Sequence, residues 1–189
     1  MKTLTGLVIG GILFLLGYSA SAQMPTAADF KPTHSIQYKF DARKWTTGAK
    51  NEVFLGRIKQ WVLPGESIDN WTEIVTEEAV NIPCSFTYSD KKFVLSEYVK
   101  HIQDKVGNGS DNFTTSILIE TPDMIVFEWA HKGSGQWPAQ REIRSVMVGR
   151  DGVVYHFAYN VKEASFSQTN YDNWKEIVLN AQLSNRRWK

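Results

Sequence analysis

The sequence has one cysteine, Cys84, among 189 residues. No disulfide can form within the chain, so a stable fold depends on packing rather than on cross-links. The neighbouring residues Ile82-Pro83 and Ser85 offer no base that could activate the thiol. We expect a buried, inert side chain, with a disulfide between two copies and thiol chemistry as the alternatives.

The signatures of the common enzyme classes are also missing. The chain contains no Gly-rich phosphate loop, no His-Glu-x-x-His, no Gly-x-Ser-x-Gly and no Cys-x-x-Cys. Basic and acidic residues are balanced, 21 against 20, which does not favour a nucleic-acid partner. From the sequence we therefore expect no cofactor, no catalytic residue and no metal site.

Long apolar runs are absent except near the start. Leu4 to Leu16 follows Lys2 and precedes Ala20-Ser21-Ala22. This run is shorter than the ~20 residues that a membrane-spanning helix needs. A basic start, a short apolar segment and small residues at its end are typical of a secretory signal peptide. We expect a signal peptide over residues 1–22 and a periplasmic or secreted mature protein with no integral membrane segment; a membrane anchor is the alternative.

The rest of the chain suits one domain. With 42% hydrophobic and 13% aromatic residues, it can bury a sizeable core. Small polar residues and prolines predict a disordered lead-in over residues 23–33. Residues 34–189 are then expected to form a single α+β domain.

Alternation of apolar and polar residues predicts strands at 36–40, 53–63, 113–121, 124–131, 141–150 and 153–161. Residues 41–50 are expected to form a connection. Asp151-Gly152 favours a two-residue type I′ turn between the last two strands. That turn sets the register and would place Arg144 opposite Tyr159 on one face of the sheet.

Helical spacing of apolar residues predicts three helices. The first begins near Ile68, after Pro64-Gly65, and carries Trp71 on its buried side. The second runs from about Lys91 to Val106, with Asp90 as its cap. The third begins near Thr169 and buries a stripe that consists of Tyr171, Trp174, Ile177, Val178 and Ala181.

The order strand, strand, helix, helix, four strands, helix resembles the PsbP/Mog1-like α/β/α sandwich and small uncharacterised exported bacterial proteins related to it. The corner Leu63-Pro64-Gly65-Glu66-Ser67 before Trp71 carries part of the resemblance, which spans Ile36 to Ala181. It implies an antiparallel sheet of about six strands with helices packed on its faces. Known members are mostly accessory or binding proteins, and no catalytic or metal residue can be transferred from them.

Trp137 lies in a glycine-rich loop before Pro138, and loops carry recognition more often than strands do. We take Trp137, with Trp129, Arg144 and Tyr159, as candidate binding residues. Packing in the core is the alternative for Trp129, whose strand position points inward.

Histidine offers little sign of a metal site. The predicted register pairs His156 with Met147, but two ligands alone do not make a site, and we expect His156 to be structural. Glu128 and His131, three apart on a strand, point to opposite faces.

Two functions from different classes remain. The first is an exported, non-catalytic binding or accessory protein, expected to be a monomer, with an unknown protein or small ligand as partner. The alternative is a small secreted or periplasmic hydrolase of unrecognised type. A pocket gathering several perturbed titratable groups would favour the enzyme, and a flat apolar patch would favour the partner protein.

Overall fold

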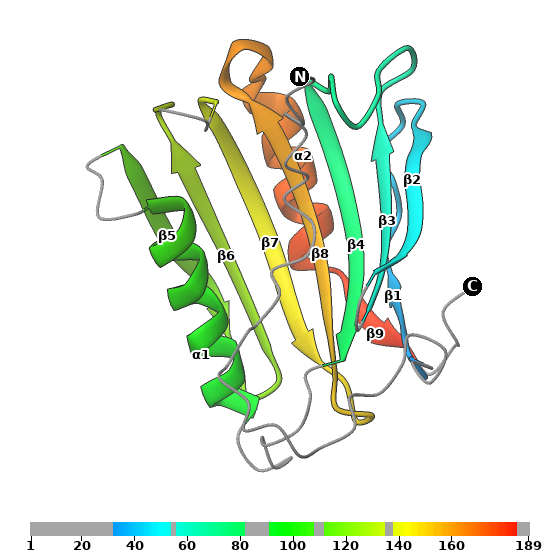
Figure 1. The fold of residues 1–189 in the computed structure, drawn as a ribbon, viewed down its shortest axis with the longest axis vertical. Helices are drawn as coiled ribbons and strands as arrows, with labels where there is room; N and C mark the ends of the chain where they lie inside the picture. Colours follow the sequence, from blue (N-terminus) through cyan, green and yellow to red (C-terminus); the bar gives the residue numbers. More distant parts are fainter. Residues whose placement is uncertain (1–31, 54–55, 82–90, 108–111, 135–137, 185–189) are drawn as a thin grey trace, which may run out of the picture.

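The computed structural model describes residues 32–53, 56–81, 91–107, 112–134 and 138–184. Within these ranges, seven antiparallel strands form one sheet in the order β2-β3-β4-β8-β7-β6-β5, and β1 pairs with β9 in a separate small sheet (Figure 1). The strands are β1 (Ser35–Gln37), β2 (Thr46–Val53), β3 (Gly56–Val62), β4 (Glu73–Asn81), β5 (Phe113–Glu120), β6 (Met124–His131), β7 (Gln140–Val148), β8 (Val153–Lys162) and β9 (Gln182–Ser184).

The helices lie on opposite sides of the large sheet. On the front face in Figure 1, α1 (Lys91–Ile102) packs on β6 and β7 and continues as a π-helical turn, η3 (Gln103–Gly107). On the back face, α2 (Gln168–Leu179) packs on β7 and β8 after a 3₁₀ turn, η4 (Glu163–Ser165). The predicted α+β fold with helices on both faces of an antiparallel sheet is therefore confirmed, with seven strands in the sheet where about six were expected.

The predicted helix from Ile68 is wrong. Residues 63–72 form a compact loop, and β4 follows it as a strand in the middle of the sheet. Gly65 has φ +87°, and the Glu66 backbone N–H donates to the Leu63 carbonyl at 3.1 Å. The Glu66 carboxylate closes the loop by accepting from the Thr72 N–H at 3.0 Å and from the Thr72 hydroxyl.

The reason for this error lies in β4 itself. Ile74, Val75 and Thr76 are β-branched and favour a strand. β4 lies between β3 and β8 in the sheet, and its residues are buried on both faces. A strand covered on both faces loses its simple alternation, so spacing alone does not distinguish it from a helix. Trp71, expected in the core, is only half-buried in the loop, and the Lys162 ammonium lies 4.8 Å from its ring centroid.

The start of the domain also differs from prediction. The first strand is shorter than 36–40, and β2 occupies the second half of the segment 41–50 that was expected to be a connection. Alternation in β2 is interrupted by a bulge between Thr47 and Ala49. Gly48 at this bulge allows Ile68 to pack closely, because a Cβ there would lie 2.6 Å from the Ile68 Cδ1 atom.

The turn between β7 and β8 has three residues rather than two. The Gly149 N–H donates to the Val153 carbonyl at 2.9 Å, and the Gly152 N–H donates to the Gly149 carbonyl at 3.2 Å. Gly152 has φ +76°. A turn followed by a left-handed glycine is the common three-residue hairpin loop.

The extra loop residue shifts the pairing by one position. Arg144 lies opposite Ala158, not Tyr159, and His156 lies opposite Val146, not Met147. Since side chains alternate between faces, this shift places Arg144 on the front face and Tyr159 on the back face. The predicted register is therefore wrong, although both strands are present.

The strands β5, β6, β7 and β8 and the helices α1 and α2 are confirmed, with small differences at their ends. Ser167 caps α2 two residues before the predicted start, and its hydroxyl accepts from the Asn170 N–H at 3.4 Å. Tyr171, Trp174 and Val178 are buried as expected. Asp90 and Cys84 lie outside the described residues. No helix in the described ranges has the length and apolar character to cross a membrane.

A candidate site in a buried polar network

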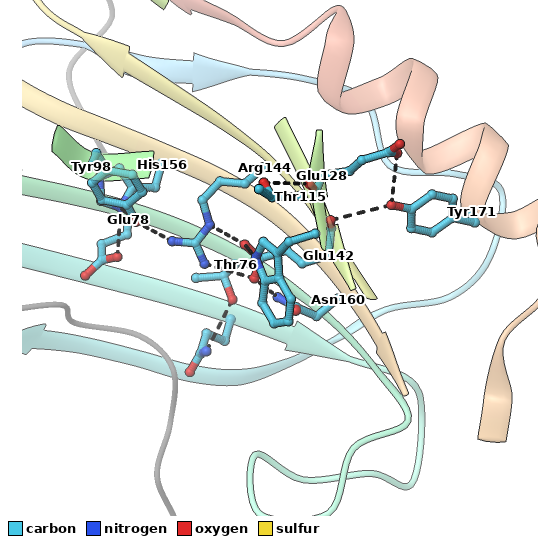
Figure 2. A network of polar contacts seen from close by, with 12 residues as sticks. Thr76, Glu78, Tyr98, Thr115, Glu128, Glu142, Arg144, His156, Asn160 and Tyr171 are labelled. Carbon is cyan, nitrogen blue, oxygen red and sulfur yellow. Dashed lines mark hydrogen bonds and ion pairs between the residues drawn. The ribbon is translucent and has the colours of Figure 1, made fainter. Parts of the chain in front are cut away.

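Polar side chains fill the middle of the front face where a core would ordinarily be apolar. Alternation directs the even-numbered residues of β4, β7 and β8 to this face, beside α1. The group, called here the front-face network, comprises Gln60, Thr76, Glu78, Tyr98, Trp129, Glu142, Arg144, His156 and Asn160, all of them buried. Figure 2 labels all of these except Gln60 and Trp129.

Glu142 is the acceptor at the centre of the network. Its carboxylate accepts two hydrogen bonds from the Arg144 guanidinium, at 2.6 and 3.0 Å. The Trp129 indole N–H donates to it at 2.9 Å, and the Asn160 side-chain amide donates at 2.5 Å. Four donors on one carboxylate compensate much of the cost of burying its charge.

Arg144 connects this carboxylate to α1. One guanidinium N–H donates to the Tyr98 hydroxyl, and the guanidinium carbon of Arg144, Cζ, lies 5.9 Å from the Tyr98 ring centroid. Burial lowers the pKa of Arg144, but Glu142 and Tyr98 outweigh burial and raise that pKa above its usual range. The side chain is therefore a permanent cation held between β7 and α1.

His156 lies between Tyr98 and Glu78. Its Nδ1 atom is 3.1 Å from Glu78 Oε2 and 3.2 Å from the Tyr98 hydroxyl. Burial lowers the pKa of His156 more than the contact with Glu78 raises it, so the ring is neutral at pH 7. Because a carboxylate only accepts, we assign the ring proton to Nδ1, which leaves Nε2 as an acceptor.

Within the described part of the chain, three buried polar atoms of the network have no hydrogen-bond partner, namely Glu78 Oε1, His156 Nε2 and Asn160 Oδ1. Asn160 is four residues along β8 from His156, so its Oδ1 atom does not converge with His156 Nε2. No group of three or more metal-ligating residues occurs in the described ranges.

The back face holds polar groups of a different kind, placed around an aromatic core. Tyr159 stacks on Trp174 with ring centroids 5.0 Å apart, and its hydroxyl donates to Glu73 at 2.5 Å. The Tyr38 hydroxyl donates to Glu77 at 3.2 Å. Burial is the main reason that the pKa of Glu77 is raised, to about 7.

Asp151, predicted only as a turn residue, also holds the start of the described chain. Its carboxylate accepts from the Thr33 N–H at 2.9 Å, the Thr33 hydroxyl at 2.8 Å and the Tyr155 hydroxyl at 2.8 Å. Burial raises the pKa of Asp151, but these hydrogen bonds and the one from His34 outweigh burial and lower it to about 2. Thr33, placed by prediction in the disordered lead-in, is thus fixed to the hairpin.

Thr33, His34 and Asp151 include the residue types of a nucleophile, a base and an orienting acid. The Thr33 hydroxyl and the Asp151 carboxylate both contact the same ring nitrogen, His34 Nδ1, at 2.9 and 3.2 Å. A catalytic triad requires the acid and the nucleophile on opposite nitrogens of the ring. This geometry is that of a structural clamp.

The structure separates the four candidate binding residues. Trp129 and Arg144 both contact Glu142 on the front face, while Tyr159 lies on the back face against Trp174. Trp137 lies outside the described residues. His156 and Met147, considered together as metal ligands, also lie on opposite faces, and Met147 belongs to the back-face core.

Sequence reasoning did not identify Glu78, Tyr98, Glu142 or Asn160. A signal was present, because Glu142 and Arg144 carry opposite charges two residues apart in a predicted strand, and thus lie on one face. A buried pair of opposite charge is the natural reading of that spacing. Tyr98, however, belongs to a helix, and only the packing of α1 on the sheet shows that its hydroxyl contacts Arg144 and His156.

No family model matches the chain, and no curated protein matches it. Among solved structures, it is similar to the solution structure of cyanobacterial PsbP (CyanoP) from Synechocystis sp. PCC 6803. The match has 12% sequence identity and a TM-score of 0.48, and covers 90% of this chain and 99% of that one. This is the fold family that the order of elements resembles. At this identity the likeness concerns the path of the chain, and nothing about function follows from it.

Proposed function

We propose that the chain is an exported, non-catalytic binding or accessory protein. The observation that carries the proposal is the way the front-face network uses its charges. Arg144, the cation that could otherwise meet a substrate, is 3% exposed and held by both oxygens of Glu142. Charged groups that are buried and hydrogen-bonded to one another in this way stabilise a fold, and they are not available to bind or react with a substrate.

Export is proposed from residues 1–22 alone. The test is to express the full chain in a bacterium, separate the periplasm from the membrane, and measure the intact mass of the product. A periplasmic product that begins at Gln23 supports the proposal. A product in the membrane fraction that retains Met1 to Ala22 contradicts it.

Binding is proposed at the connection between the end of β6 and the start of β7, which carries Trp137 in the sequence; Trp129 of β6 is buried and is not part of the proposed surface. A photo-reactive amino acid at Trp137 should cross-link a specific partner in the intact cell. The matched control places the same group at Lys50, an exposed residue of the opposite sheet edge. Cross-links only at the Trp137 position support the proposal; equal or absent cross-links at both positions contradict it.

One observation favours the alternative, a small hydrolase. Glu78 contacts His156 through Nδ1 while Nε2 has no partner, which is how a carboxylate orients a general base. The test compares hydrolysis of ester, peptide and phosphate substrates by the unmodified protein, His156→Gln and, as control, His34→Gln. Activity that only His156→Gln abolishes would establish the hydrolase and overturn the non-catalytic proposal.

A further inference from the structure

The two edges of the large sheet differ in how they are protected from further pairing. The β2 edge carries Lys50 and a glycine bulge. The β5 edge has no charged residue from Phe113 to Ile119, no proline, and one bulge between Ile117 and Ile119. Proteins commonly place lysine or proline on an edge strand to prevent pairing with another chain, and β5 lacks both.

The two large hydrophobic residues that the described chain exposes, Ile117 at 51% and Phe93 at 42%, belong to β5 and to the helix beside it. Ile117 lies opposite Phe127, whose ring is 6.5 Å from that of Tyr98 in α1, so Ile117 is on the front face. At the start of α1, next to Phe93, the Lys92 ammonium lies 3.2 Å from Glu120 at the end of β5.

We propose that β5 is a docking edge for a second copy of this chain. The two β5 strands pair antiparallel about a twofold axis, so that the large sheet continues from one copy into the other. The segment Phe113–Ile119 then meets itself, and the junction contains no buried charge. Ile117 and Phe93 of both copies lose exposed apolar surface, which is the driving force.

Charge at the two ends of β5 favours antiparallel over parallel pairing. Glu120 ends the strand, its side chain is 42% exposed, and it pairs with Lys92 of the same chain. At the other end, Phe113 lies close to Gly107 of η3, a turn that carries Asp104 and Lys105, and the last turn of α1 carries Lys100 and His101. Antiparallel pairing places the Glu120 end of each strand near this end of the other, whereas parallel pairing would place the two Glu120 side chains together.

Pairing of β5 with β2, the strand at the other end of the sheet order among the described residues, is the alternative contact. It is a heterologous contact that would propagate into an open filament, and it places Lys50 beside an uncharged strand. Pairing of β5 with β5 uses the same edge twice and closes. The proposal is therefore a dimer, in place of the monomer expected from the sequence.

The experiment is sedimentation velocity of the chain from Gln23 across the micromolar range. We expect a concentration-dependent monomer and dimer, and at least a tenfold weaker association for Ile117→Lys. The matched control, Thr47→Lys, adds the same charge at an exposed position of β2 and should dimerise like the unmodified chain. Far-ultraviolet circular dichroism and thermal unfolding of each variant report whether the fold is kept.

A monomer at every concentration, species larger than a dimer, or an Ile117→Lys variant that associates normally would each overturn the proposal. If Ile117→Lys does not fold, Ser116→Lys, which changes an exposed neighbour on the same edge, takes its place. The assay measures self-association only, so a negative result does not affect the proposals on export and partner binding. Negative results in the tests of export and partner binding likewise do not affect the dimer proposal.

Discussion

The front and back faces of the same sheet are buried by different physical means. Behind the sheet, Trp174, Tyr159 and Phe157 form an aromatic core, and two buried carboxylates, Asp41 and Glu73, accept hydrogen bonds from the Trp174 and Tyr159 side chains. In front, Glu142 and Arg144 place a carboxylate and a guanidinium in the middle of the packing. Burial of aromatic side chains stabilises the fold through the hydrophobic effect, which does not depend on the orientation of the groups. A buried ion pair stabilises the fold only if both charges keep their partners. Substitutions should therefore fail differently on the two faces.

The largest loss is expected behind the sheet. Trp174→Ala removes a fully buried indole that contacts Tyr159, Phe157 and Trp45, and it should lower the free energy of unfolding by ~3–5 kcal/mol. Urea unfolding of the variant measures this. Trp174→Phe should restore a large part of the loss, because shape and apolar area matter here more than the one hydrogen bond to Asp41. No restoration would contradict an apolar origin of the stability.

In front, we expect the cost to depend on which partner of the pair is removed. Glu142→Leu leaves the Arg144 cation, the Trp129 N–H and the Asn160 amide without their acceptor, and should cost ~3–5 kcal/mol. Arg144→Met should cost less, because the carboxylate keeps two of its donors. Chemical unfolding of both variants at pH 7 makes the comparison. Equal losses would show that the number of donors on Glu142 is irrelevant.

The two faces should also respond to pH in opposite directions. His156 has a lowered pKa in the folded protein, so the unfolded chain binds the proton first and stability is lost as pH falls below about 6.5. Glu77 has a pKa raised to about 7, so the folded protein keeps a proton that the unfolded chain releases, and stability is lost as pH rises from about 4.5 to 7.

Urea unfolding between pH 4.5 and pH 7 separates these contributions, each of which amounts to about 1.4 kcal/mol per unit of pKa difference. His156→Gln should remove the loss on the acid side, and Glu77→Gln should remove the loss toward neutral pH. Parallel pH profiles for the two variants would contradict the assignment of opposite signs.

The smallest effect is expected at Trp71. Its ring is half-buried in the loop before β4 and contacts Lys162, so Trp71→Ala should cost under ~1 kcal/mol, the scale of an exposed cation–π contact. Thermal unfolding next to Trp174→Ala provides the contrast. A loss as large as that of Trp174→Ala would place Trp71 in the core, as a helix at this position would have required.

Much of the fold could be predicted where elements face the core with one side only. β6 matches its predicted range, and α1 and α2 were found from their helical stripes. β4 could not be found in this way, because it is buried on both faces. The candidate site depended on the register, and one extra turn residue before Gly152 separated Arg144 from Tyr159.

The sequence by itself determined the local preferences: one cysteine and so no internal disulfide, two amphipathic helices, and the alternation that forms β5 to β8. It also placed Glu142 and Arg144 two residues apart, and so on one face. Only the tertiary structure decided that β4 is a strand, that Tyr98 reaches His156 from α1, and that β2 and β5 form the edges. The spacing of apolar residues in a segment such as β4 is compatible with either a helix or a strand. Contacts with residues distant in the chain supply the energy that favours one of the two.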